Sequence, residues 1–450
     1  MPDQVSPQRL KIGIVGTGIA GMSSAWLLSH NHDVTVFEKD DRIGGHTNTV
    51  DVNGLGVDTG FIVYNVANYP NLIALFDHLG VKTQATDMSF GVSVDQGDFE
   101  YSGGDLKGLF AQKRNLLRPR FWSMVKDILR FYRDAPAAIV NDADDSITLG
   151  DYLSLNRYSH AFQRDHLLPM GAAIWSTPVD TMLEYPLNAF LRFCDNHGLL
   201  QVSDRPQWRT VVGGSREYVK KLTANYSDKI ITNSAVTKVY ADANGAYVEV
   251  RNGIVHHFDH VVMASHADQS LNLLGSYDAA ERKLLEAFTY QPNKAILHTD
   301  ASLMPRNKQA WSSWNYLSES QDGEDSVCVT YWMNRLQNLK TETDYFVTLN
   351  PTHLPKEGSI VRSFLYHHPM FDRAAIAAQR MLWSIQGQRR LWFCGSYFGH
   401  GFHEDALQSG LAVAEAVGGV RRPWTVENES GRINLPANWS QLMQQSQEAA

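Results

Sequence analysis

Two glycine-rich turns near opposite ends of the chain have the residue types that bind phosphate. One spans residues 16–21 and the other spans residues 395–410. Glycines in such a turn allow a tight bend, close approach of the backbone to a pyrophosphate, and close packing of a helix on a strand. Both turns lead into segments that we expect to be helical, and helix N-termini bind anions. The pattern indicates one long ligand held at both ends of the chain. The expected phosphate contacts in the first turn are Gly16, Gly18, Ile19, Ala20 and Gly21.

The residues around the first turn predict the elements that position it. Residues 11–15 form a short apolar run typical of a buried strand, and residues 20–28 continue as a helix of small and apolar residues. A second strand is expected at residues 34–37 and ends in Glu38. This acid follows the glycines by about 20 residues, where it can accept a hydrogen bond from a ribose hydroxyl. The order of these features indicates an α/β dinucleotide-binding unit.

A second flexible turn follows the acid and bears on which dinucleotide is bound. Lys39 and Arg42 supply positive charge, and Gly44 and Gly45 allow the backbone to bend. A fixed cation and a second turn can both reach the phosphates, which NAD sites do not need. We therefore favour FAD, with an ordinary surface turn and an NAD-only dehydrogenase as the alternatives.

These motifs resemble those of the flavin-dependent amine oxidoreductase superfamily, which includes amine oxidases, protoporphyrinogen oxidase and phytoene-type desaturases. The resemblance implies an α/β protein with a glutathione-reductase-like FAD-binding Rossmann domain and an interleaved α+β substrate domain. No cysteine lies in a recognisable attachment context, so the FAD is expected to be non-covalently bound. The resemblance rests on Gly16, Gly18, Gly21, Glu38, Arg42, Gly44, Gly45, residues 57–60, residues 212–214 and residues 395–410.

The same resemblance assigns parts of the cofactor to individual residues. Glu38 would hold the adenosine ribose, and Arg42 would lie on the phosphate side. Gly60 and Phe61 would approach the isoalloxazine ring, and Val236 would approach the adenine. These positions lie far apart in the sequence, so the resemblance predicts that the fold brings them together.

The C-terminal turn is expected to contact the flavin end of the cofactor. A helix is predicted from residue 404, and its N-terminus would direct a positive dipole toward the ring. N–H groups near Phe402 and His403 would stabilise negative charge on the reduced ring. The family often has an acid directly after the glycine that matches Gly395. This chain has Ser396 there, which would hydrogen-bond a ribityl hydroxyl more weakly.

Two residues are candidates for the chemistry itself. Lys294 falls where amine oxidases keep a lysine that holds a water at the flavin, although an ordinary strand lysine is the other interpretation. His403 is the histidine expected to lie nearest the reacting groups. The segment from His400 to Glu404 does not have the order and spacing of a zinc-binding helix, so no metal is expected.

Composition limits the classes of protein that this chain can belong to. It has 450 residues, 43% hydrophobic and 20% charged, with a net charge of -8, which argues against a nucleic-acid partner. Three cysteines without paired spacing fit a reducing compartment. We see no secretory signal and no apolar run long enough to span a bilayer, so a cytoplasmic location is expected. The oligomeric state is not indicated.

The flavin-domain motifs are spread along the chain, which predicts interleaved domains. The FAD-binding domain is expected to comprise residues 1–80, 205–285 and 386–422. Residues 81–204 and 286–385 would form the substrate domain. Residues 423–450 are polar and are expected to form a loosely held tail.

Residues 112–134 are unusually basic, with seven Lys and Arg residues against two Asp. Pro119 can start a helix, and Phe121, Met124, Val125, Ile128 and Tyr132 would share one face of it. Lys126, Arg130 and Arg133 would gather on the opposite face, with Trp122 and Leu129 on the flank. This pattern is typical of a helix in an anionic lipid interface, which would make the protein peripheral on the inner face of the membrane. A helix packed on its own domain with a solvated basic face is the other interpretation.

The sequence favours one function and leaves others open. We expect an FAD-dependent oxidoreductase that removes a hydride from a C–H bond of a small apolar substrate or a lipid acyl chain. The reduced cofactor would pass its electrons to oxygen, a quinone or another acceptor. The alternatives are an amine oxidase that produces hydrogen peroxide and a redox-inactive protein that binds FAD.

Overall fold

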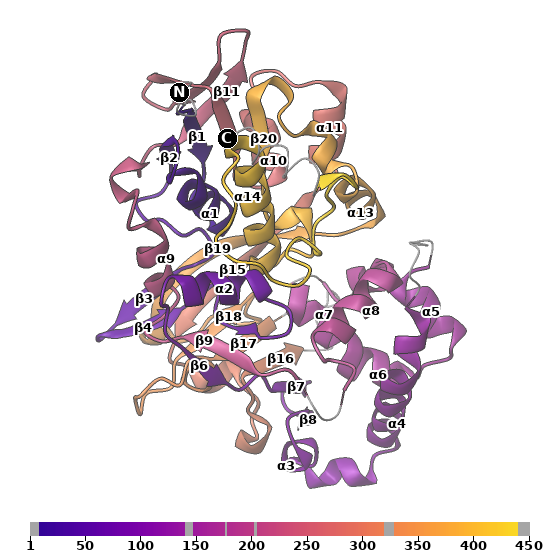
Figure 1. Cartoon of the computed structure of the whole chain (residues 1–450). Coiled ribbons are helices and arrows are strands. Elements are labelled where there is room, and N and C mark those ends of the chain that lie inside the picture. Colours follow the sequence, from indigo (N-terminus) through magenta and orange to yellow (C-terminus); the bar gives the residue numbers. More distant parts are fainter. Residues whose placement is uncertain (1–8, 140–146, 176–177, 202–204, 319–327, 440–450) are drawn as a thin grey trace.

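A parallel five-stranded sheet organises one half of the molecule (Figure 1). The computed structural model describes residues 9–139, 147–175, 178–201, 205–318 and 328–439. The strand order is β10-β2-β1-β14-β20, and each neighbouring pair is parallel. The strands come from three separated stretches of chain, the interleaved order expected from the sequence. They are β1 (Lys11–Val15), β2 (Asp33–Phe37), β10 (Ile230–Ile231), β14 (His260–Met263) and β20 (Leu391–Phe393).

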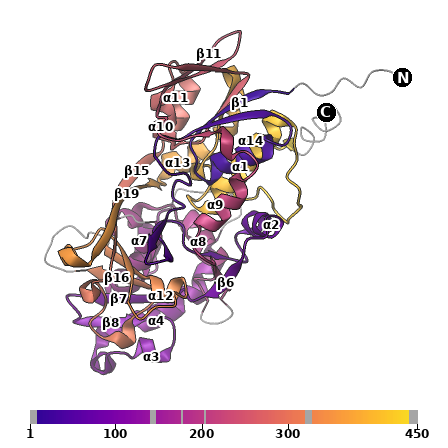
Figure 2. The same ribbon diagram turned by 90° about the vertical axis from the view of Figure 1, so that its left-hand side faces the viewer.

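Two helices from opposite ends of the chain pack against each other beside this sheet, α1 (Ile19–Leu28) and α14 (His403–Gly418) (Figures 1 and 2). Every residue of α1 is buried, which explains why small and apolar residues surround the whole helix. A Cβ at Gly410 would lie 2.3 Å from the carbonyl oxygen of Ala20, so the two backbones touch. The hydroxyl of Ser24 donates to the carbonyl of Gly410 across the same contact.

A larger mixed sheet forms the middle of the molecule, with the strand order β19-β15-β18-β17-β16-β7-β8. Its two longest strands, β15 (Thr289–His298) and β19 (Ile360–Met370), form an antiparallel pair that extends toward the five-stranded sheet (Figure 2). The other strands are β7 (Phe90–Val94), β8 (Phe99–Ser102), β16 (Trp314–Ser318), β17 (Cys328–Trp332) and β18 (Phe346–Leu349). The α/β class expected from the sequence is therefore observed.

Helices between residues 106 and 196 form a separate region at one end of the molecule (Figure 1). The predicted helix after Pro119 is present and buries Phe121, Met124 and Phe131 in the core. The helices are α3 (Leu106–Leu109), α4 (Pro119–Asp134), α5 (Leu149–Leu155), α6 (His160–Phe162), α7 (Leu168–Trp175) and α8 (Leu187–Asn196).

Smaller elements connect these parts. The β3–β4 hairpin follows the second glycine turn, β5-β9-β6 forms a small antiparallel sheet, and β11-β12-β13 forms another. The strands are β3 (Thr49–Val52), β4 (Leu55–Asp58), β5 (Tyr64–Asn65), β6 (Thr83–Thr86), β9 (Trp208–Val211), β11 (Val236–Ala241), β12 (Ala246–Val250) and β13 (Val255–Phe258). The remaining helices are α2 (Pro70–His78), α9 (Arg216–Thr223), α10 (Ala267–Leu273), α11 (Ala279–Leu285), α12 (Met333–Leu336) and α13 (Arg373–Gln379).

The part of the C-terminal tail that is described, residues 423–439, is packed on the molecule rather than loosely held as the sequence predicted. Trp424 stacks on Trp26 of α1 with ring centres 5.7 Å apart. Arg432 is half-buried and donates to Asp405, and Ile433 is buried. These three side chains therefore anchor an otherwise polar tail to the rest of the molecule. Residues 440–450 lie outside the described part of the chain.

Across the described ranges, no helix has both the length and the apolar character needed to cross a membrane.

Candidate functional site

The first glycine turn leaves the start of α1 open for an anion. No side chain caps the helix, and its first turn has no acidic residue, so its N-terminal N–H groups and positive dipole end are available. Gly16 has a φ of +107°, which strains any other residue. A Cβ at Gly21 would lie 2.1 Å from the carbonyl oxygen of Gly16, whereas a Cβ at Gly18 would meet nothing within 4 Å. The absence of a side chain at Gly21 therefore lets the helix pack closely on the turn. Gly18 instead faces open space that phosphates can occupy. Ile19 and Ala20 form the first helical turn, as predicted.

Glu38 lies beside this turn as the sequence predicted. It directly follows β2 and is buried, and one carboxylate oxygen accepts a hydrogen bond from the backbone N–H of Asp40. The other oxygen accepts from the backbone N–H and the hydroxyl of Thr17. Thr17 was not predicted as a site residue, although its place between the two glycines could have suggested it. The adjacent Lys39 is exposed.

The second glycine turn contacts the first. The N–H of Gly44 donates to the carbonyl of Thr17 at 3.1 Å. A Cβ on Gly45 would lie 3.0 Å from the Cα of Gly18. Gly44 and Gly45 both have positive φ, at +113° and +58°. The two turns thus form one surface, and the guanidinium of Arg42 is held beside it by donating to the carbonyl of Thr47.

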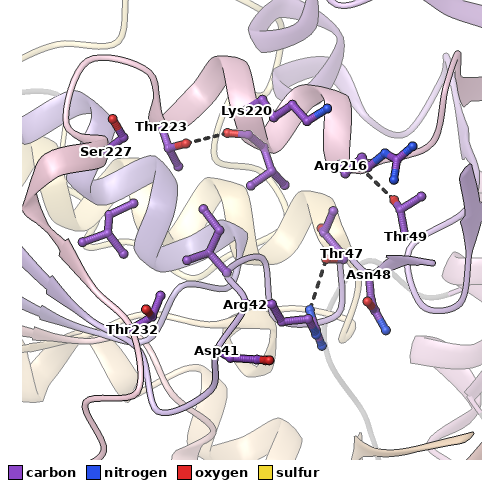
Figure 3. Close-up of a pocket in the computed structure, with 13 residues that line it drawn as sticks. Asp41, Arg42, Thr47, Asn48, Thr49, Arg216, Lys220, Thr223, Ser227 and Thr232 are labelled. Carbon is purple, nitrogen blue, oxygen red and sulfur yellow. Dashed lines mark hydrogen bonds between the residues drawn. The ribbon is translucent and has the colours of Figure 1, made fainter. Parts of the chain in front are cut away.

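A cleft of about 490 Å³ opens next to Arg42, between the segment after Glu38 and α9 (Figure 3). Arg42, Arg216 and Lys220 bring positive charge to it, while Asp41 brings one negative charge. Hydroxyl and amide groups make up much of the remaining polar lining. The polar residues concerned are Thr47, Asn48, Thr49, Thr223, Ser227 and Thr232.

A buried acid, Asp58, joins the motif at residues 57–60 to the glycine turn before α9. Its carboxylate accepts from the backbone N–H and the hydroxyl of Ser215, and from the hydroxyl of Thr49. Burial raises the pKa of Asp58 to about 7, and these hydrogen bonds oppose that rise. A Cβ at Gly60 would lie 2.0 Å from the carbonyl oxygen of His46, so only glycine fits there. The sequence resemblance included both motifs but did not reveal that they bind each other.

Phe61 and His403, both predicted near the flavin ring, lie in direct contact. Their rings stack with centres 3.8 Å apart. The Nε2 atom of His403 is 2.6 Å from the hydroxyl of Tyr218 and 3.4 Å from that of Thr47. Burial lowers the pKa of His403 to about 3, so the imidazole is neutral at physiological pH. Tyr218, in the first turn of α9, was not predicted as part of this group.

The C-terminal turn follows β20, so it emerges from the same edge of the parallel sheet as the first glycine turn. Gly395 donates its N–H to the hydroxyl of Ser409, and Ser396 is half-buried. The N–H of Phe402 already donates to Asp405, which corrects the expectation that it is free to face the flavin. The carboxylate of Asp405, in the first turn of α14, therefore takes the N–H group that was expected to face the flavin.

Val236 lies where an adenine contact was predicted, at the start of β11 and half-buried. The segment before it runs along β2. The N–H of Glu38 donates to the carbonyl of Ile231, and the N–H of Ser234 donates to the carbonyl of Glu38. The predicted ribose and adenine contacts are therefore neighbours.

Lys294 lies on β15 with its side chain exposed. The preceding Asn293 is buried and hydrogen-bonds His368, because alternate residues of a strand face opposite sides. This placement favours the interpretation of Lys294 as an ordinary strand lysine.

Three histidines gather near the turn that contains Gly45. The ring of His46 lies 5.5 Å from that of His368 and 6.1 Å from that of His266, centre to centre. Burial lowers the pKa of His46 to about 4, with a further contribution from the charge of Arg42. Burial also lowers the pKa values of His266 and His368 to about 3. The cluster is therefore polar but uncharged at neutral pH.

These residues fit FAD on observations of this structure. An uncapped helix N-terminus, open space at Gly18 and a buried carboxylate at Glu38 suit a pyrophosphate and its ribose. Arg42, Gly44 and Gly45 would lie on the phosphate side, and Phe61 and His403 would lie at the ring end.

Comparisons with known proteins agree with this geometry. The family model described as "Flavin containing amine oxidoreductase" matches residues 19–341. The chain is 28% identical over 251 residues to a flavin-containing monoamine oxidase, AofH, of Mycobacterium tuberculosis, a match that covers 54% of each protein. The chain thus spans about half the length of that relative.

Solved structures share the fold at low sequence identity. Cyclohexylamine oxidase from Brevibacterium oxydans superposes with a TM-score of 0.64 at 16% identity, over 91% of this chain and 99% of that one. A fatty acid isomerase from P. acnes superposes with the same TM-score at 14% identity, over 89% of this chain and 97% of that one. At these identities the likeness concerns the fold alone.

Proposed function

Because the chain belongs to the flavin-containing amine oxidoreductase family, we propose that it removes a hydride from a C–H bond of an apolar substrate such as a lipid acyl chain. Membership confirms the resemblance predicted from the glycine motifs, FAD as the cofactor and flavin-dependent oxidoreductase as the enzyme class. Bound FAD would supply the acceptor for the hydride, and the second hydrogen of the new double bond would leave as a proton to solvent. An external acceptor then takes up the two electrons.

The proposal rests on the aromatic contact at the start of α14. Phe402 stacks on Phe193 of α8 with ring centres 5.0 Å apart, and Trp175 of α7 lies 6.5 Å away. Phe193 and Trp175 belong to the helical region, and both lie against Phe402, which precedes His403. Buried aromatic rings of the helical region therefore make the surroundings of Phe402 apolar, beside the end of the molecule where the flavin ring is expected.

The charged groups nearby also favour an uncharged substrate. Both oxygens of Glu404 accept backbone hydrogen bonds from α2, at Asn71 and Leu72. Asp405 is paired with Arg432. These two acids are engaged within the protein, and His403 is neutral, so this group offers no free carboxylate to a protonated amine.

An amine oxidase is the second candidate, supported by the similarity to AofH, which is named for monoamine oxidation. The two solved structures described above are named for a fatty acid and for an amine, so their likeness does not separate the candidates.

The test uses the FAD-loaded protein under anaerobic conditions. It is mixed separately with a membrane lipid extract and with a panel of primary and secondary amines, and the absorbance of oxidised flavin is followed. We expect the lipid extract to bleach the flavin and the amines to leave it unchanged. Mass spectrometry of the extract then identifies a product two hydrogens lighter than its substrate.

Two results would overturn the proposal. Bleaching by amines alone, with hydrogen peroxide formed in air, would assign an amine oxidase. Retention of oxidised flavin with every donor, in a protein that dithionite still reduces, would favour the redox-inactive alternative.

A further inference from the structure

Four exposed residues of α4 form a stripe of alternating apolar and basic side chains. They are Trp122, Lys126, Leu129 and Arg133, and their spacing of three or four residues places them on one face. Trp122 is 46% and Leu129 is 55% exposed, so two large apolar side chains of the stripe face solvent. The stripe therefore presents apolar surface to solvent along the whole helix.

The segments before α4 also expose leucines. Leu106 in α3 is 72% exposed, and Leu117 is 88% exposed. Leu116 is also exposed, and its carbonyl accepts a hydrogen bond from the indole N–H of Trp122, which joins these turns to the helix. We call these five residues the docking patch: Leu106, Leu116, Leu117, Trp122 and Leu129.

Three lysines in the same stretch of chain as the docking patch have no ion-pair partner among the described residues. Lys107, Lys113 and Lys126 are exposed, and among the residues with assigned structure none of them forms a salt bridge. The nearby Asp98 is engaged by Arg114 and Arg118. These segments therefore combine apolar side chains with three lysines outside ion pairs, while one exposed acid, Asp105, caps α3 beside Leu106.

The apolar face of α4 is packed on the protein, as in the alternative that the sequence left open. Phe121 and Met124 are buried, and Val125, Ile128 and Tyr132 pack against the core. Arg130 is also engaged, because it pairs with Asp127 at 3.4 Å and lies over the ring of Tyr158. The side of α4 that stays exposed to solvent is therefore the stripe defined above. The sequence had placed two of its residues, Trp122 and Leu129, on the flank of the helix.

We propose that the docking patch binds the surface of an anionic phospholipid bilayer. Exposed leucines and a tryptophan can enter the boundary between headgroups and acyl chains, and the lysines match the negative headgroups. The helical region with α3 and α4 lies at the end of the molecule opposite the β11–β13 sheet (Figures 1 and 2), so a flat surface can approach it. The inference does not depend on the proposed substrate.

The test measures co-sedimentation of the full-length, FAD-loaded protein with vesicles. Vesicles of phosphatidylcholine alone are compared with vesicles that contain phosphatidylglycerol, at low and at high salt. We expect binding to the anionic vesicles only, with release at high salt. Each basic residue near an anionic surface contributes about fivefold in affinity, so K113E/K126E should weaken binding by at least about 25-fold.

A second variant tests the apolar part. L106S/L117S changes side chains that are largely exposed, so its melting temperature and FAD content should equal those of the wild type, while binding to anionic vesicles falls at least tenfold. The matched control is L354S/K340E, which changes an exposed leucine and an exposed lysine elsewhere and should bind like the wild type.

The proposal is overturned if the wild type does not sediment with anionic vesicles at low salt, or if both patch variants sediment as it does. It is also overturned if the leucine variant converts a dimer into monomers without any change in vesicle binding, because the patch would then join two copies of the chain.

Discussion

The imidazole of His403 lies face to face with the phenyl ring of Phe61, with ring centres 3.8 Å apart and planes 7° apart. Phe61 follows the β3–β4 hairpin, and His403 begins α14, more than three hundred residues later. The hydroxyl of Tyr218 in α9 completes the contact at 2.6 Å from Nε2. Three distant segments therefore meet at the point where the flavin ring is expected.

Phe61 and His403 should be energetically coupled. In a double-mutant cycle with Phe61→Leu and His403→Gln, we expect a coupling of about 1 kcal/mol in the free energy of unfolding, the usual contribution of an aromatic pair. Urea denaturation of the four proteins, all without FAD, gives this value. Additive effects of the two substitutions would mean that the rings do not interact.

Gly18 and Gly21 should respond differently to alanine. Gly21→Ala pushes a methyl group into the carbonyl of Gly16 and should lower the free energy of unfolding by about 1–3 kcal/mol. Gly18→Ala places its methyl group in open space, so the FAD-free protein should keep its melting temperature. Its affinity for FAD should nevertheless fall at least tenfold, because phosphates need that space. Thermal melts and flavin titration measure the two effects, and normal FAD binding by Gly18→Ala would remove the turn from the cofactor site.

Glu38→Gln should weaken FAD binding while the protein remains folded. A charged hydrogen bond to a ribose hydroxyl contributes about 1.5–3 kcal/mol, which is roughly 10- to 150-fold in affinity. The dissociation constant from flavin fluorescence quenching provides the measurement. Asp40→Asn, on an exposed neighbour, is the matched control and should bind FAD normally. Equal affinities of the two variants would contradict the ribose contact.

Local sequence was enough to predict the elements that carry the first glycine turn. The strand before it, the helix after it and the strand ending in Glu38 depend on contiguous residues, with apolar runs and glycines at fixed offsets. The start of α4 after Pro119 was predictable for the same reason.

Contacts between distant segments could not be predicted in this way. Asp58 binds Ser215 across 157 residues, and Tyr218 meets His403 across 185. The periodicity of α4 fitted both a helix at a lipid interface and a helix packed on its own domain, and only the structure shows that its apolar face packs on the core. The packed tail was missed because composition averages over the few residues, such as Trp424, that anchor it.

Lys294→Met distinguishes the two interpretations of this lysine. Since the side chain is exposed on β15, we expect turnover and the rate of flavin reduction to stay within twofold of the wild type. A lysine that acts at the flavin would instead lower the rate of flavin reduction by 100-fold or more. Anaerobic stopped-flow measurement of that rate, with the substrate found above, decides between them.

Buried histidines should make the protein sensitive to mild acid, and His166 provides a clean test because it lies in the helical region. Its Nδ1 atom contacts the hydroxyl of Tyr101, and burial lowers its pKa from 6.5 to about 3. Below pH 6.5 the unfolded chain binds a proton at this position that the folded protein does not, so stability falls as the pH decreases toward 3. The expected contribution is about 1.4 kcal/mol per pH unit.

His166→Gln should reduce the slope of unfolding free energy between pH 6 and 4 by about that amount, whereas substitution of the exposed His160 by Gln should leave the slope unchanged. Equal slopes for the two variants would show that His166 is not held neutral by the fold.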